Sequence, residues 1–278
     1  MTTDVAPTDE DDRPPEGRSV PVRTHVDRAR AHARSERAAL AEKRDAFAAF
    51  VDRIERLSPE SSSPAVSTAG GGLVRDVAPA PDRRATVRAA FAETVRPHSV
   101  ADVDGDEPLL ETVRQELSEP IAVALAPATE ASFSPALKRA VLARAAARRT
   151  ETDVTRRALG REAGHLDAAA EDVERITAWI AAADETPLTD LGFAALRARH
   201  ETLARHRERC DDLAARRQAF LDGATSEGPE ASLDHRRLLA FLYGPFPVDH
   251  PVLATVASLD GTCADCQRAV RRHLVRRV

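Results

Sequence analysis

Two stretches of the sequence repeat inward-facing side chains every three or four residues, the spacing of one face of an α-helix. In residues 24–57 the repeat consists of Val26, Ala33, Leu40, Phe47, Val51 and Ile54, with Arg30, Arg37 and Arg44 between them. In residues 189–222 it consists of Leu196, Arg199, Leu203, His206, Cys210, Leu213, Arg217 and Phe220. Each stretch makes a helix of about 50 Å at 1.5 Å per residue. We expect two long coiled-coil-like helices that pair antiparallel.

The remaining sequence also favours helices. Aromatic residues make up only 4% of the 278 residues, and no long alternation of apolar and polar side chains is present. Ser134-Pro135 is typical of a helix start, and that helix could continue past residue 150 toward Ala183, although Gly160 and Gly164 weaken this stretch and could mark a kink. Further helices are expected over 82–96, 106–117, 232–243 and 250–259, with a last one from Thr262. The predicted fold is all-α, an elongated helical bundle.

The ends and joints of the chain are predicted from composition. Residues 1–23 are acidic, rich in proline and nearly free of large apolar side chains, which predicts a disordered tail. Thr24 and Asp27 form a capping box that starts the first long helix, residues 24–57. Residues 58–81 are rich in Ser, Pro and Gly and predict a linker, and residues 82–278 form the helical domain. Gly223 is predicted to cap the second long helix.

The charge of the chain and the absence of recognisable targeting signals limit its possible functions and location. The net charge is −5, although 38 of the 40 basic residues are arginine, so the whole chain does not attract nucleic acid or an anionic membrane. The start lacks the features of a signal peptide, and the most apolar stretch, residues 121–128, is too short to cross a membrane. Three cysteines do not suit a secreted disulfide framework. We therefore expect a cytoplasmic protein, and with no catalytic motif matched, a protein that is not an enzyme.

One group of residues carries possible metal chemistry. His206 and Cys210 lie one turn apart on the inward face of the second long helix, and Cys263 and Cys266 form a C-x-x-C near the end of the chain. Four such ligands from two helices could bind one Zn²⁺, with no position left open for water. The predicted role is a structural zinc that fastens the second long helix to the last helix. His235 and His250 are possible substitutes for His206.

Two other interpretations of these cysteines remain open. Cysteine is among the most frequently buried residue types, so the same residues could simply pack in the core. Alternatively, a C-x-x-C at the start of a helix capped by Thr262 would lower the thiol pKa and give a redox protein. That redox interpretation lacks the βαβ context in which such motifs usually occur.

The arginines support two further predictions. On the long helices, Arg37, Arg44, Arg199 and Arg217 lie where their guanidinium groups could bridge to carboxylates on a neighbouring helix. The last helix carries an arginine face that could bind a phosphate backbone or simply remain solvated, made of Arg268, Arg271, Arg272, Arg276 and Arg277. A DNA-associated regulator that uses this face is therefore an alternative function.

Three segments also carry a resemblance. They are THVDRARAHARSER at Thr24 to Arg37, SPALKRAVL at Ser134 to Leu142, and CADCQRAV at Cys263 to Val270. They are similar to an uncharacterised haloarchaeal helical family, a domain of unknown function, and the resemblance implies no activity. The function expected from the sequence is therefore structural or interaction-mediating. The partner would be another protein, or a second copy in a homo-oligomer, bound through the long helices.

Overall fold

A computed structural model describes residues 24–60, 82–99, 108–129, 131–226 and 229–276. These residues form helices and turns, and none of them is in a β-strand. The all-α prediction is confirmed. In chain order the elements are α1 (His25–Arg56), α2 (Arg83–Thr94), η1 (Arg96–His98), α3 (Leu109–Glu116), α4 (Glu119–Leu125), α5 (Pro135–Asp184), η3 (Leu188–Asp190), α6 (Phe193–Ser226), α7 (Pro229–Tyr243) and α8 (Pro251–Val275).

Local sequence signals set the helix starts. The Thr24 side chain accepts from the Asp27 amide, and Asp27 in turn accepts from the Thr24 amide, so the predicted capping box is present. Asp82 accepts from the Arg84 amide at the start of α2, and Ser134 accepts from the Leu137 amide at the start of α5. Each cap satisfies an amide that the first helical turn leaves without a backbone partner. The predicted tail, most of the linker and the Asp106 cap lie outside the described residues.

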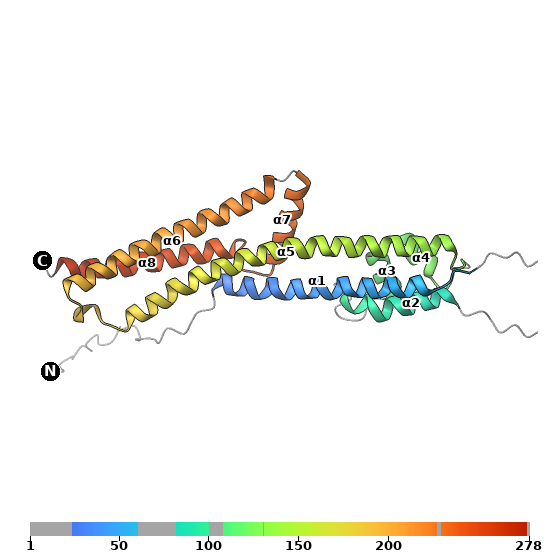
Figure 1. Cartoon of the computed structure of the whole chain (residues 1–278), viewed down its shortest axis with the longest axis horizontal. Helices are drawn as coiled ribbons and strands as arrows, with labels where there is room; N and C mark the ends of the chain where they lie inside the picture. Colours follow the sequence, from blue (N-terminus) through green and yellow to red (C-terminus); the bar gives the residue numbers. More distant parts are fainter. Residues whose placement is uncertain (1–23, 61–81, 100–107, 130, 227–228, 277–278) are drawn as a thin grey trace, which may run out of the picture.

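The molecule is a rod built on α5, whose 50 residues extend over about 75 Å. α1 runs antiparallel along α5 (Figure 1), with Arg30 Nε 2.5 Å from Asp167 Oδ1 and Arg44 Nη1 4.0 Å from Asp153 Oδ1. The prediction that the helices over 24–57 and 189–222 pair with each other is wrong, because α1 packs mainly on α5 and α6 packs mainly on α8. Arg30 and Arg44 are fourteen residues apart on α1, and so are Asp153 and Asp167 on α5. The positive and negative side chains can therefore pair at both positions, which favours α5 as the partner of α1.

Two separate cores lie along this rod. The short-helix core joins the second half of α1 and the first half of α5 to α2, α3 and α4, and its largest buried side chains are Phe47, Phe50, Phe91 and Phe133. The long-helix core joins the first half of α1 and the second half of α5 to α6, α7 and α8. It is built mainly of Leu, Ala and Val. The first turn of α1 also contacts α8, since the Val26 amide donates to Thr255 Oγ1 at 3.2 Å.

Two predicted helix boundaries at this end are wrong. α6 continues to Ser226, so Gly223 lies within the helix and does not cap it. α8 is one helix of 25 residues, not a short helix followed by a separate helix from Thr262. Thr262 Oγ1 donates to the Ser258 carbonyl at 3.0 Å, which is a contact within a continuous helix. Gly261 is tolerated there because a helix can include a glycine at a cost of about 1 kcal/mol.

Long basic side chains cap the carboxyl ends of helices in the short-helix core by donating hydrogen bonds to terminal carbonyls. Lys138 donates to the Glu55 and Leu57 carbonyls at the end of α1, at 2.7 and 2.9 Å. Arg144 donates to the Leu117 carbonyl after α3, and Arg88 to the Leu125 carbonyl at the end of α4. These contacts satisfy carbonyls that have no partner within the helix and oppose the negative end of its dipole. Those of Arg144 and Arg88 stabilise α3 and α4, helices of eight and seven residues that are too short to be stable alone.

Candidate functional site between helices 5, 6 and 8

The predicted zinc ligands lie at the interface of α6 and α8. Cys210 and Cys263 are fully buried, on α6 and α8 respectively, and Cys266 is half-buried one turn further along α8. The two helices are held in register by Arg207, whose Nε lies 2.8 Å from Asp260 Oδ1. Cys210 and Cys263 are close enough to interact electrostatically. The structure therefore brings thiols from the two predicted pairs to one interface.

The environment of these cysteines opposes ionisation. The C-x-x-C lies in the middle of α8. The prediction that Cys263 lies at the positive end of a helix dipole is therefore wrong. Burial, and secondly the Cys263 thiol, raises the pKa of Cys210 to about 12. Burial, and secondly the Cys266 thiol, raises the pKa of Cys263 to about 11. Burial and Asp184 also raise the pKa of Cys266. At neutral pH all three are thiols, which is the form that thiol–disulfide exchange does not use.

His206, one turn before Cys210 on α6, packs on α5. Its ring packs on Trp179 of α5 with ring centroids 4.9 Å apart, and its Nε2 is buried without a hydrogen-bond partner among the described residues. Burial, and secondly the charge of Arg205, lowers the pKa of His206, so the ring is neutral at neutral pH. A surface hollow of about 340 Å³ lies beside Trp179 and Arg199. His206 thus has a free neutral nitrogen, the form that binds a metal.

The metal geometry itself is not assembled. In the part of the chain that the structure describes, no three or more His, Cys, Asp or Glu side chains are arranged to hold an ion. Of the possible substitutes for His206, His250 is exposed at the start of α8, and the side chain of His235 lies outside the described residues. The zinc prediction for His206, Cys210, Cys263 and Cys266 therefore stays a prediction, as does the interpretation of these residues as packing.

A buried ion pair joins α5, α6 and α7 further along the same core. Arg217 donates from Nη2 to Glu162 Oε1 at 2.8 Å and from Nη1 to Glu162 Oε2 at 3.0 Å. Tyr243 of α7 donates to the same Oε1, and burial followed by Glu162 raises the pKa of this phenol. Glu162 is 0% exposed and Arg217 is 3% exposed. The inward position of Arg217 was predicted, but its partners were not, because Glu162 is one of many carboxylates in the sequence.

A second carboxylate, that of Asp172, binds two arginines across the α5–α6 gap and one on its own helix. Asp172 of α5 accepts from Arg209 and Arg216 of α6, at 2.9 and 2.7 Å, and from Arg175 of α5 at 2.8 Å. Burial alone would raise the pKa of Asp172, but the hydrogen bonds from Arg209 and Arg216 outweigh it and lower the pKa. The predicted bridging by arginines on the helix stripes is thus confirmed for Arg217, and Asp172 provides a second bridge of this kind.

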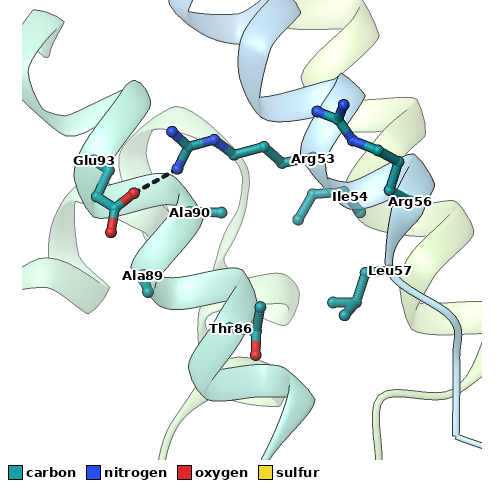
Figure 2. Close-up of a pocket in the computed structure, with 8 residues that line it drawn as sticks. All are labelled: Arg53, Ile54, Arg56, Leu57, Thr86, Ala89, Ala90 and Glu93. Atoms are coloured by element: carbon teal, nitrogen blue, oxygen red, sulfur yellow. Dashed lines mark hydrogen bonds and ion pairs between the residues drawn. The ribbon is translucent and has the colours of Figure 1, made fainter.

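A shallow groove of about 360 Å³ lies at the other end of the rod, between the last turn of α1 and α2. Figure 2 shows its apolar lining, which includes Ile54 and Leu57 on α1 and Ala90 on α2. The ion pair between Arg53 Nη1 and Glu93 Oε2, 2.5 Å long, crosses from one helix to the other. The groove contains no group that suggests catalysis, and its side chains complete the packing of the two helices.

The arginine face of α8 is exposed, as predicted. Arg268 pairs with Asp265, and Arg271 Nη2 lies 3.5 Å from His200 Nε2 on α6. Arg272 and Arg276 are exposed, and Arg277 lies outside the described residues. Among the described helices, none combines the length and the apolar character needed to cross a membrane.

Comparison with known families gives one match over these helices. Residues 24–267 match the family described as Domain of unknown function (DUF7260). The chain belongs to this family. The DUF7260 match covers the short-helix core and most of the long-helix core, and it includes all four predicted zinc ligands. Comparisons with curated proteins and with solved structures returned no match.

Proposed function

We propose that this chain is a structural helical protein that associates with a protein partner, or with a second copy of itself, through its long helices. The observation that supports this proposal is the continuous α1–α5 pair, which connects two separately packed cores and makes α5 a spacer of about 75 Å. A helix that is packed into a core at each end holds the two ends of the rod at a fixed separation. Such a spacer is suited to positioning other molecules.

The long helices also expose large apolar side chains on which such an association could rest. Val154, in the middle of α5, is 55% exposed, and Phe193, at the start of α6, is 52% exposed. Single exposed apolar side chains are common on protein surfaces, so the proposal depends on whether these particular residues are buried by a partner.

Sedimentation velocity of the full chain over a range of concentration and salt tests the proposal. We expect a concentration-dependent dimer, or a stoichiometric protein partner that co-purifies from native lysate. Val154→Glu and Phe193→Glu should weaken that association by about tenfold or more, because each would bury an unpaired charge. Val275→Glu is the matched control, since Val275 is 72% exposed but lies at the end of α8. A monomer at every concentration, with no stoichiometric partner, would contradict the proposal.

A structural zinc between α6 and α8 is the second part of this proposal. Its support is the buried, unpartnered Nε2 of His206 together with the buried thiols of Cys210 on α6 and Cys263 on α8. Cys266 would complete a set of four ligands after rotation of the side chains, and the ion would fasten the two helices without catalysing a reaction.

Metal analysis of the purified full chain tests the zinc directly. We expect about one zinc per chain, as a closed four-ligand site requires. Cys263→Ser should lose the metal and lower the melting temperature, whereas His273→Gln, which changes a half-buried histidine of α8 outside the set, should retain it. No zinc in the native chain, with unchanged melting of Cys263→Ser, would contradict the zinc and leave the proposed association untouched.

A further inference from the structure

Arginines of α1 meet α5 at three positions separated by steps of seven residues. Arg30 lies on Asp167 at 2.5 Å, and Arg44 Nη1 lies 4.0 Å from Asp153. Midway between them, Arg37 lies on Gly160, where a β-carbon would be 3.8 Å from the Arg37 Cζ. The two outer arginines therefore have a carboxylate on α5 beneath them, and the middle one has a glycine.

Arg37 is consequently a charge without a partner in the described part of the chain. Its side chain is exposed, and it makes no hydrogen bond or ion pair with any residue that the structure describes. Because Gly160 has no side chain, the guanidinium group lies against the α5 backbone with its donors available. A long, exposed arginine usually gains from a carboxylate or phosphate that matches its planar donors.

The surroundings of Arg37 carry an excess of positive charge. We call this surface the arginine seam, and its cations are Arg30, Arg34, Arg37, Arg44, Arg156 and Arg157. Among the residues that the structure describes, its six guanidinium groups share only four carboxylates, those of Asp45, Asp153, Asp167 and Glu174. Arg34 and Arg157 keep 56% and 61% of their side-chain surface exposed. The seam can therefore accept further negative charge.

The chain carries a complementary acidic segment a short way before α1 in the sequence. Residues 9–12 read Asp-Glu-Asp-Asp and precede Thr24, the first described residue, by twelve positions. Twelve residues can extend over about 40 Å. Arg37 is thirteen residues along α1 from Thr24, a distance of about 20 Å. The acidic segment can therefore reach Arg37 with length to spare.

We propose that the acidic segment, residues 9–12, docks on the arginine seam around Arg37 and covers it. Docking pairs its carboxylates with the guanidinium groups that lack enough partners. The tether places the segment near the seam at an effective concentration of about millimolar, which an external ligand must exceed. The net charge of −5 also repels an external polyanion such as nucleic acid, so the observations favour the segment of this chain.

Arginine modification of the full chain tests this docking at Arg37. The variant neutralises the segment by Asp9→Asn, Glu10→Gln, Asp11→Asn and Asp12→Asn. Phenylglyoxal should modify Arg37 about two- to fivefold more slowly in the native chain than in this variant at low salt, the range expected for exposed ion pairs. The difference should vanish in 1 M salt because the pairing is screened. Arg272, exposed on α8, is the internal control and should react equally in both.

A second pair of variants tests the docking from the seam side. Gly160→Asp places a carboxylate beneath Arg37 and competes with the acidic segment, whereas Gly160→Asn adds a similar volume without charge. Cleavage after Glu10 by a Glu-specific protease should be about two- to fivefold faster in Gly160→Asp than in Gly160→Asn. Circular dichroism checks that both variants remain helical.

Two outcomes would overturn the proposal. The first is equal reactivity of Arg37 in the native and neutralised chains at low salt, together with equal cleavage in the two Gly160 variants. The second is protection of Arg37 by added duplex DNA to the same degree in the native and neutralised chains, which would assign the seam to an external polyanion.

Discussion

The two cores of this rod use different interactions to hold their helices together. In the short-helix core, Phe47, Phe50, Phe91 and Phe133 are fully buried, and Phe50 and Phe91 meet edge to face with centroids 5.6 Å apart. In the long-helix core the buried side chains are mainly Leu, Ala and Val, and buried charged groups join α5 to α6. Glu162 and Asp172 of α5 each bind arginine of α6.

Helix length explains this difference. α3 and α4 have eight and seven residues, so they depend on a few large side chains that bury much apolar surface each. α5, α6 and α8 have many turns over which to distribute their contacts, and small side chains suffice where α6 meets α8. Where α6 diverges from α5 (Figure 1), long arginine side chains cross the gap and end on carboxylates. The comparison implies that the cores respond differently to loss of apolar volume and of charge.

The largest expected effect in the short-helix core comes from loss of an aromatic side chain. Phe91→Ala should lower the free energy of unfolding by about 3–5 kcal/mol, because it removes buried apolar surface and leaves a cavity against Phe50. Urea denaturation followed by circular dichroism measures this. Phe241→Ala is the matched control, since Phe241 is 56% exposed on α7, and it should change stability by less than about 0.5 kcal/mol. Equal effects of the two substitutions would refute the aromatic core.

The corresponding effect in the long-helix core comes from loss of a charge. Glu162→Ala should cost about 3–5 kcal/mol, because it leaves Arg217 buried and unpaired. Replacing both partners by Glu162→Leu with Arg217→Met should recover most of that loss, since neither position then carries an unpaired buried charge. Tyr243→Phe removes only one hydrogen bond, and should cost about 1–2 kcal/mol. A double variant as unstable as Glu162→Ala would show that packing, not charge, causes the loss.

Acid should weaken both cores through one carboxylate in each. Burial would raise the pKa of Glu116 in the short-helix core, but hydrogen bonds from Lys43 and Arg148 outweigh it and lower the pKa. The pKa of Asp172 is lowered in the same way in the long-helix core. A lowered folded-state pKa contributes stability above the unfolded pKa, about 4, and loses it as the pH falls through the folded value. Urea titrations of Glu116→Gln and Asp172→Asn should thus differ from the native chain at pH 7 and approach it in acid. A difference that persists unchanged in acid would contradict this linkage.

The smallest expected effect is a gain in stability within α5. Nothing lies within 4 Å of a β-carbon placed at Gly164, so Gly164→Ala should stabilise the protein by about 0.5–1 kcal/mol through reduced chain entropy in the unfolded state. Thermal unfolding measures the shift. Gly244→Ala is the contrasting variant, because its β-carbon would lie 2.9 Å from the Ala240 carbonyl oxygen, and it should destabilise. A loss of stability in Gly164→Ala would mean that α5 is kinked or contacted there.

Local rules in the sequence predicted the helices but not their partners. The caps at Thr24 and Ser134 follow from residue type and spacing alone. The pairing of α1 with α5 becomes visible only when the charged positions of the two helices are compared. Asp153 and Asp167 have the same spacing as Arg30 and Arg44, and this was the signal that could have revealed the pairing. Thr262 resembled a cap because threonine is favoured at helix starts, but its hydroxyl bonds the Ser258 carbonyl within α8.

The candidate site was predicted in part. The inward positions of Cys210 and Arg217 follow from the stripe of α6, and both are buried. The sequence could not place His206 against Trp179, because that contact depends on how α5 and α6 approach each other in space. Glu162 was also inaccessible to prediction, since its burial follows from the same approach and from α7, which brings Tyr243 to it.

Hydrogen exchange of the full chain and of its Glu162→Ala and Phe91→Ala variants at neutral pH, read by mass spectrometry, tests the contrast between the two cores most directly. The account predicts that Glu162→Ala lowers the protection of amides in α6 and α7 and leaves that of α2 and α4 unchanged, and that Phe91→Ala does the reverse, because a buried ion pair fastens the long-helix core and aromatic side chains fasten the short-helix core. Equal loss of protection in both cores from either variant would contradict it.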